Sequence, residues 1–223
     1  MKIGLFGDIH AEDERLAAAL AHVKALGATL LVSVGDIADG RGDLERTCVL
    51  LEDNQVLTVR GNHDRWLLAD ELRQLPHAHR REELSPRTLA FLEALPATRE
   101  LDTPLGRALV CHGVGDNDMK QLRPEHDGYE LANNDELHAL LAARTYTLVL
   151  GGHTHARMLR TFTGADRHEL TVINAGTFRA WDDPCFALVD FDRGVVDFFA
   201  ASDAKKITLL ESSPLPRAPA SPG

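Results

Sequence analysis

The sequence has few cysteines, and none of them is placed to form a pair. Only Cys48, Cys111 and Cys185 are present, they are far apart, and no CxxC motif occurs. An odd number of widely spaced cysteines argues against a disulfide framework and is typical of reduced thiols in a cytosolic protein. We therefore expect a cytoplasmic location.

Long hydrophobic runs are also missing. No apolar stretch approaches the roughly 20 residues that span a bilayer. The first ten residues, MKIGLFGDIH, hold one lysine and a short apolar run that ends at Asp8. This start predicts a first strand and no signal peptide, and the chain as a whole predicts no membrane partner.

Basic residues are outnumbered. The chain has 24 Lys and Arg against 34 Asp and Glu, a net charge of -10 with neutral histidines. Non-specific nucleic-acid binding depends on Lys and Arg that neutralise phosphates, so we expect no nucleic-acid partner. A small phosphorylated substrate is not excluded, because bound metal cations can reverse the local sign of charge.

What the sequence does contain is an alternation of strands and helices in its first half. Its 223 residues, 44% of them hydrophobic, suit one soluble domain with its own core. Apolar runs predict buried strands at 2–6, 29–34 and 55–59. Helices are predicted between them at 12–26 and 44–51. This is the βαβ pattern of a parallel sheet.

The second half is richer in strands. We expect helices at 65–75, 86–95 and 133–143, and strands at 108–111, 145–150, 157–162, 170–173, 186–190, 195–200 and 206–210. The pattern predicts an α/β fold with two sheets, mostly parallel and then mostly antiparallel, and helices outside. We place one domain at 1–212, a polar insertion within it at 114–144, and a proline-rich tail at 213–223.

Polar residues follow five of the predicted strands at the point where each strand ends. In α/β sheets, ligands bind outside the carboxyl ends of the strands, so these residues could meet in one crevice. The candidates are Asp8, His10, Asp36, Asp39, Asn62, His63, Asp64, His112, His153 and His155.

The spacing of these residues favours a metal site. Asp8 and His10, like His153 and His155, are two residues apart, and an extended chain points alternate side chains the same way. The carboxylates, imidazoles and amide are too many for one tetrahedral zinc. They suit two divalent ions of higher coordination, bridged by a carboxylate.

Each motif by itself is weak evidence. A single Asp-x-His is usually a turn or a surface pair, and GNHD alone is more often a turn than a site. Co-occurrence in order, each at a strand exit, makes coincidence a poor explanation. The remaining histidines are interpreted as ordinary surface or loop residues: His22, His77, His79, His126, His138 and His168.

The ordered set of motifs resembles the signature of the calcineurin-like metallophosphoesterases, in particular their small bacterial members. The set reads D-x-H, GD, GNH[DE], H and GH-x-H. It matches DIH at 8–10, GD at 35–36, GNHD at 61–64, HG at 112–113 and GHTH at 152–155. INAGT at 173–177 resembles the INPGS segment of small members. The resemblance implies a four-layer αββα sandwich of two mixed sheets.

It also implies a role for each matching residue. One metal ion is expected on Asp8, His10 and His155, the other on Asn62, His112 and His153, with Asp36 between them. His63 is the expected general acid, and Asp64 is expected to be structural. Asp39 lies where phosphatase-like members carry an Asp that orients the catalytic His. Capping of the next helix is the alternative role for Asp39.

Two positions depart from the family pattern. Ala11 stands where Gly usually follows D-x-H. The phosphatase-like branch reads GDxxDRG, but here Gly40 occupies the Arg position and Arg41 follows. This shift puts in doubt both a substrate-binding role for Arg41 and a serine/threonine protein phosphatase activity.

Other interpretations fit less well. Amidohydrolases need an early H-x-H and a larger barrel, and metallo-β-lactamase-like enzymes need HxHxDH. A non-catalytic scaffold with this fold typically lacks the catalytic His or several ligands, whereas this chain keeps all of them. A phosphatase of the serine/threonine type remains a further alternative.

The resemblance therefore implies a phosphoesterase that hydrolyses small phosphodiesters or phosphomonoesters. A hydroxide that bridges the two ions would attack phosphorus in line, and His63 would protonate the leaving group. Mn²⁺ is the first expectation, with Fe, Ni, Zn or Mg as alternatives. The insertion at 114–144 follows His112 and carries seven acidic against three basic residues. We expect this acidic rim to repel substrates with many phosphates. The sequence leaves the oligomeric state open, with a homo-oligomer as one alternative.

Overall fold

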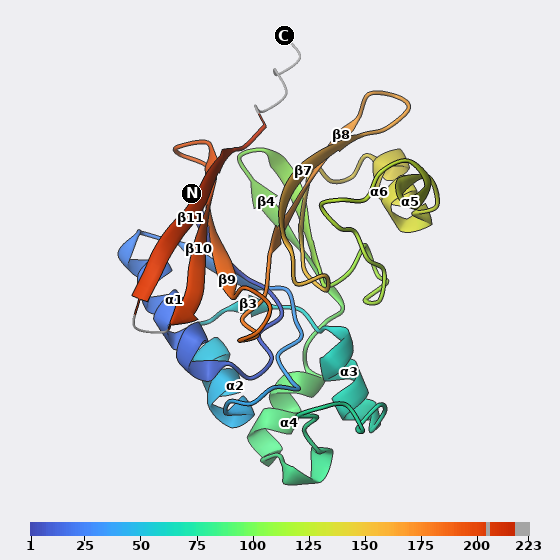
Figure 1. Cartoon of the computed structure of the whole chain (residues 1–223). Coiled ribbons are helices and arrows are strands. Elements are labelled where there is room, and N and C mark those ends of the chain that lie inside the picture. Colours follow the sequence, from blue (N-terminus) through green and yellow to red (C-terminus); the bar gives the residue numbers. More distant parts are fainter. Residues whose placement is uncertain (204–205, 217–223) are drawn as a thin grey trace.

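The computed structural model describes residues 1–203 and 206–216 and shows two β-sheets packed face to face (Figure 1). The first sheet has the order β11-β10-β9-β1-β2-β3, and the second has the order β4-β5-β6-β8-β7. In the first sheet β1, β2 and β3 are parallel, while β9 to β11 run antiparallel to their neighbours. In the second, β5, β6 and β8 are parallel between the antiparallel edge strands β4 and β7.

The strands of the first sheet are β1 (Lys2–Phe6), β2 (Leu30–Ser33), β3 (Leu57–Thr58), β9 (Cys185–Asp190), β10 (Val195–Asp203) and β11 (Lys206–Pro214). Those of the second are β4 (Thr98–Thr103), β5 (Gly106–Cys111), β6 (Leu148–Gly151), β7 (Arg157–Thr163) and β8 (Glu169–Ala175). The helices are α1 (Asp13–Ala25), α2 (Leu44–Asp53), α3 (Asn62–Ala69), α4 (Pro86–Glu93), α5 (Gly128–Ala132) and α6 (Asp135–Ala143), with a short 3₁₀ helix at Arg81–Glu83.

The strands are apolar on both faces because both faces are covered. Ile3 and Leu5 of β1 pack against Val110 and Leu150 of the other sheet, whereas Phe6 packs under the helices. Helix α1 buries Leu16, Ala19, Leu20 and Val23, one stripe of a helical repeat, against the outer face of the first sheet. Helix α6 covers the second sheet in the same way with Leu137 and Leu141. The four layers of the expected αββα sandwich are therefore present.

Several local expectations were wrong. The last three strands do not build the second sheet: β9, β10 and β11 return to the first sheet, so both sheets are mixed. The helix expected at 65–75 begins earlier, at Asn62, and ends at Ala69, where Asp70 adopts a left-handed φ of 57°. Strand β4 and helix α5 were missed, because β4 is a polar edge strand without an apolar run and α5 buries none of its residues.

The proline-rich segment at 213–223 is only partly described. Strand β11 continues to Pro214, which pairs with Val195 of β10, and Leu215 is buried in the core between the sheets. Residues 217–223 of the expected tail lie outside the described residues. Among the described residues, no helix combines the length and apolar character needed to cross a bilayer.

Candidate metal centre

The carboxyl ends of the parallel strands of both sheets meet on one side of the molecule, and the predicted site residues lie there. Each residue sits one to six positions beyond the end of β1, β2, β3, β5 or β6. The chain turns sharply there: Asp8, His10, Asp36, Asp39, His153 and His155 all have positive φ, between 44° and 69°. Left-handed non-glycine residues cost of order 1–3 kcal/mol each and cluster at functional sites. The strain turns these side chains toward one another.

Two positions next to these residues must be glycine, because the backbone there lies very close to neighbouring side chains. A Cβ atom on Gly61 would overlap the Asp36 carboxylate, and a Cβ on Gly152 would overlap the side chains of Val34 and Asp8. The GNHD and GGHTH turns can therefore approach the carboxylates only because these positions lack a side chain.

The first ligand group consists of Asp8, His10, Asp36 and His155, whose donor atoms all lie within 4.8 Å of one another. His10 Nε2 is 3.2 Å from His155 Nε2, and His155 Nε2 is 3.5 Å from Asp8 Oδ1. Asp8, His10 and Asp36 are buried. Four such donors around one point are sufficient for a divalent cation.

The second group consists of Asp36, His112 and His153, joined by Asn62. Asn62 Oδ1 is 2.9 Å from both His112 Nε2 and His153 Nδ1. His112 Nε2 is 3.3 Å from Asp36 Oδ2. Asp36 belongs to both groups, so its carboxylate lies between the two clusters.

The histidine tautomers favour cation binding in the first group. His10 Nδ1–H donates to the carbonyls of Ala38 and Asp39, at 3.1 and 3.0 Å, and His155 Nδ1–H donates to Asp182 Oδ2 at 2.9 Å. In the neutral rings, the two Nε2 atoms that face each other at 3.2 Å then both carry lone pairs. Two facing acceptors repel unless a cation lies between them, so the residues present fit a metal ion.

In the second group, His112 Nδ1–H donates to Val34 O at 2.8 Å, which again leaves Nε2 for the cluster. Burial lowers the pKa of His112, but the adjacent Asp36 carboxylate outweighs it and raises this pKa to about 10. Burial would raise the pKa of Asp36, and its interaction with His112 instead lowers it. An ion bound here must displace the proton on His112, so the affinity for metal falls at low pH.

Three further ligands, Asp8, His10 and His153, have the pKa shifts that burial predicts. Burial raises the pKa of Asp8 to about 6, and it lowers the pKa values of His10 and His153 to about 3 and about 4. Both imidazoles are therefore neutral at pH 7 and available as ligands without losing a proton.

His63 lies beside the clusters but belongs to neither. Its Nδ1 is 2.8 Å from Asp39 Oδ2, and its backbone N–H donates to Asp36 Oδ1 at 2.8 Å. The ring contacts His10 edge-on, with ring centroids 4.9 Å apart. Burial lowers the pKa of His63, but the hydrogen bond to Asp39 and the charge of Asp36 outweigh it and raise this pKa.

Asp39 is held by more than His63. Arg73 donates to both of its oxygens, at 2.9 and 3.0 Å, and the backbone N–H of His79 donates to Oδ1 at 3.0 Å. In return, the Asp39 backbone N–H donates to His79 Nδ1 at 3.0 Å. Arg73 was missed, and His79 is a half-buried loop residue whose contacts with Asp39 were not anticipated. Neither follows a strand, so the strand-exit pattern could not reveal them.

Asp64 connects two of the site loops. Its Oδ1 accepts from the backbone N–H groups of Ile37 and Ala38, at 2.9 and 3.0 Å, and its Oδ2 accepts from Gly61 N–H at 2.9 Å. The carboxylate is fully buried, and it lies away from both ligand groups. It thereby fixes the loop that carries Asp36 to the turn that carries Asn62.

The INAGT segment supports the other loops. Asn174 donates from Nδ2 to Gly152 O at 2.8 Å and to Thr154 Oγ1 at 3.0 Å. Thr177 donates from its hydroxyl to Asp8 O at 2.8 Å. Five residues later, Asp182 orients His155. Asp182 was missed, although an acidic pair just beyond a strand and the INAGT turn was a readable signal.

Arg41 forms its side-chain contacts with residues outside both ligand groups. It is exposed, donates from Nε to His77 Nε2 at 3.0 Å, and lies 5.1 Å from the ring centroid of Trp181. Arginine cannot take the preceding position with this backbone, because a Cβ on Gly40 would overlap the carbonyl of His10. The departure from GDxxDRG thus has a steric cause.

Fold and site together define an α/β sandwich with paired Asp, His and Asn clusters at the strand ends. The family profile of the calcineurin-like phosphoesterase superfamily domain matches residues 1–194, and the chain belongs to this family.

Solved structures show the same fold. A metallophosphoesterase from Sphaerobacter thermophilus aligns with a TM-score of 0.63 and 20% identity over 90% of this chain and 87% of that chain. The E. coli phosphoesterase YfcE aligns with a TM-score of 0.57 and 16% identity, over 97% of this chain and 100% of that one. An archaeal phosphodiesterase aligns with a TM-score of 0.55 and 16% identity, over 94% and 100%. At these identities, the likeness is one of fold.

Proposed function

We propose that this protein is a phosphoester hydrolase that uses two divalent metal ions and acts on small phosphodiesters or phosphomonoesters. The observation that carries the proposal is the position of Asp36, shared by two ligand groups that include every predicted ligand. Bound ions would supply an activated water and neutralise the oxygens of the reacting phosphate. Mn²⁺ is our first choice, because the carboxylate and amide oxygens of both groups suit it, while the imidazoles keep Fe, Ni and Zn as alternatives.

The protein's own residues would then position and protonate the substrate. His63 holds its Nδ1 against Asp39, so Nε2 is the ring nitrogen available to a substrate. We assign to His63 Nε2 the donation of a proton to the departing oxygen. General acid catalysis of this kind typically contributes a factor of about 10²–10⁴ to the rate. Asp39 keeps the ring in one orientation, and Arg73 keeps Asp39 in place.

The preference between substrates rests on Arg41. A dianionic monoester gains more than a diester from an arginine over the reacting phosphate. Arg41 is turned toward His77 and Trp181, and the steric limit at Gly40 keeps an arginine out of that position. We therefore favour diesters. The same contacts disfavour a serine/threonine phosphatase, and the complete ligand set disfavours a non-catalytic scaffold.

The test combines metal analysis with a substrate panel. Protein purified without chelator should hold close to two transition-metal ions per chain. With Mn²⁺ it should hydrolyse bis-p-nitrophenyl phosphate faster than p-nitrophenyl phosphate, and a 2′,3′-cyclic nucleotide faster than a single-stranded oligonucleotide. A single tetrahedral ion, or no hydrolysis with Mn²⁺, Ni²⁺, Zn²⁺ or Mg²⁺, would contradict the proposal.

A further inference from the structure

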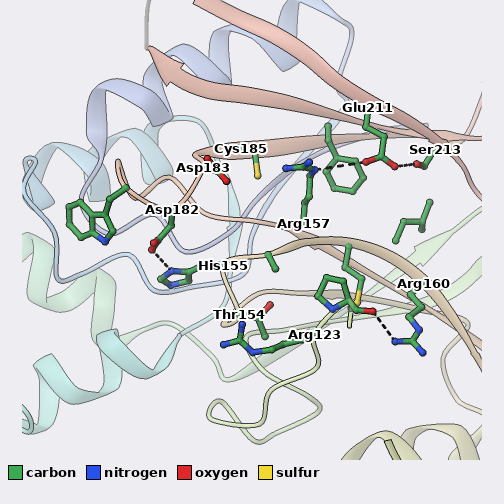
Figure 2. A pocket seen from close by; sticks show the side chains of 16 residues that line it. Arg123, Thr154, His155, Arg157, Arg160, Asp182, Asp183, Cys185, Glu211 and Ser213 are labelled. Atoms are coloured by element: carbon green, nitrogen blue, oxygen red, sulfur yellow. Dashed lines mark hydrogen bonds and ion pairs between the residues drawn. The ribbon is translucent and has the colours of Figure 1, made fainter. Parts of the chain in front are cut away.

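A groove of about 890 Å³ begins at the ligand His155 and runs along the edge strand β7. Figure 2 shows its lining, with Asp182 at one end, Arg160 toward the other and Arg157 between them. This volume lies within the range of roughly 300–1,000 Å³ that is usual for small-molecule sites. The groove therefore has room for more than the phosphate that reacts.

The insertion contributes one wall, and Arg160 attaches that wall to β7. Arg160 Nη1 donates to Pro124 O at 3.1 Å and to His126 O at 2.5 Å. Its guanidinium also lies 4.8 Å from the ring centroid of Phe162. These contacts hold the turn at 124–126 against the strand, and they thereby place the neighbouring Arg123 in the groove.

Arg123 presents an uncompensated charge to this groove. Figure 2 shows its guanidinium on the side of Thr154 and His155. Its Nε donates to Gln121 Oε1 at 3.0 Å. Among the described residues, no carboxylate lies within the 4.0 Å of an ion pair, and both terminal nitrogens lack an acceptor. An arginine left unpaired in a chain of net charge -10 points to an anionic ligand.

Two acidic residues of the insertion and two of the groove are already engaged by other basic groups. Asp118 is paired with Arg65, and Glu136 is paired with Lys120. Within the groove, Asp182 is engaged by His155, and Glu211 lies 3.9 Å from Arg157. Within the part of the chain that the structure describes, Arg123 is thus a basic side chain of this rim without a carboxylate partner.

We propose that Arg123 binds a second phosphate of the substrate, so that preferred substrates are phosphodiesters with a phosphorylated substituent. This inference rests on the proposed function. The reacting phosphate must contact both ligand groups, whereas the groove that holds Arg123 touches only the His155 side. Strand β7 lines the groove from Arg157 to Arg160, roughly 10 Å at about 3.3 Å per residue, which is enough for one small substituent.

Two substrates with the same leaving group provide the test. One is the p-nitrophenyl ester of thymidine 5′-phosphate, and the other is the same ester with a 3′-phosphate. The wild-type protein with Mn²⁺ should show kcat/KM about tenfold higher for the second, through a lower KM, because bidentate arginine–phosphate contacts are strong. Arg123→Ala and Arg123→Gln should remove this preference and leave bis-p-nitrophenyl phosphate hydrolysis unchanged.

The matched control is Arg99→Ala. Arg99 is exposed on β4, and β4 and β7 are the two opposite edges of the second sheet. This variant removes an equal charge at a position away from the groove, so it should keep the preference for the ester with the 3′-phosphate. Equal rates for the two esters in the wild type would overturn the inference. So would an equal loss on every substrate in both Arg123 variants, which would place Arg123 at the reacting phosphate.

A binding measurement separates this inference from the proposed function. Calorimetry with the metal-loaded protein should show thymidine 3′,5′-bisphosphate binding more tightly than thymidine 5′-phosphate, with the difference lost in Arg123→Gln. If no ester is hydrolysed but this difference holds, the proposed function fails and the phosphate site stands. If hydrolysis occurs and the two ligands bind equally, the phosphate site fails alone.

Discussion

His63 Nδ1 lies 2.8 Å from Asp39 Oδ2, and Asp39 is in turn held by both terminal nitrogens of Arg73. Because the carboxylate can only accept, Nδ1 carries a proton and the ring has one orientation. The pair lies next to the shared ligand Asp36, to which the His63 backbone N–H donates. A single hydrogen bond thus fixes the orientation of the ring and favours its protonated form.

Replacing Asp39 should move the pH profile. The general acid works in its protonated form, and the raised pKa of His63 keeps that form present to higher pH. Activity should therefore fall as pH rises through this pKa. Asp39→Asn removes the hydrogen bond to a charged carboxylate, so the alkaline limb of kcat/KM should shift to lower pH. An unchanged alkaline limb would show that another group sets it.

Replacing His63 should separate protonation from metal binding. His63→Ala should retain both ions and lose about 10²–10⁴ in rate with alkoxide leaving groups. The loss should be much smaller with p-nitrophenolate, which departs without a proton. Metal analysis and the two rates check this. Loss of the ions, or equal losses for the two leaving groups, would exclude the general-acid role.

Unlike replacement of His63, replacement of Asp36 should reduce metal binding as well as activity. Asp36→Asn removes the one carboxylate that both ligand groups share, so bound metal and activity should fall together. The buried His112 also loses the charge that raises its pKa, which makes its ring easier to deprotonate. Metal retention at two ions per chain would contradict a bridging position. Inductively coupled plasma analysis and turnover of bis-p-nitrophenyl phosphate provide the measurements.

Replacing Asp64 should affect stability first. Asp64→Ala leaves three buried backbone N–H groups without an acceptor, at Ile37, Ala38 and Gly61. We expect a loss of about 3–5 kcal/mol in the free energy of unfolding, measured by urea denaturation of the metal-free protein. Asp53→Ala is the control, because Asp53 lies at the exposed end of α2. Its effect should stay within about 0.5 kcal/mol.

The features that could be predicted from the sequence are those that a few consecutive residues determine. Asp8-x-His10 and His153-x-His155 can be recognised because each pair follows an apolar run and its two residues are two positions apart. The buried strands β1, β2 and β6 reveal themselves because both of their faces are covered, which makes them continuously apolar. In these cases one short window contains the physical cause of the structure.

The features that were missed depend on partners distant in the chain. Arg73 matters only because the segment after α3 folds back onto Asp39, and Asp182 matters only because it meets His155. The return of β9 to pair with β1 is likewise a contact across most of the chain. Composition likewise does not record which charges of the rim are paired: Asp118 pairs with Arg65 and Glu136 with Lys120.

The carbonyl of Asp8 accepts hydrogen bonds from Thr177 and Phe178, near the other end of the chain. The strained turn that carries the first ligand therefore acquires its support only when those residues are in place. During synthesis, a nascent chain that has released β1 to β3 from the ribosome already exposes Asp8, His10, Asp36 and Asn62, without the segment that holds them in position. The first ligand group, together with the residue that orients His155, is complete only after the chain up to Asp182 has emerged.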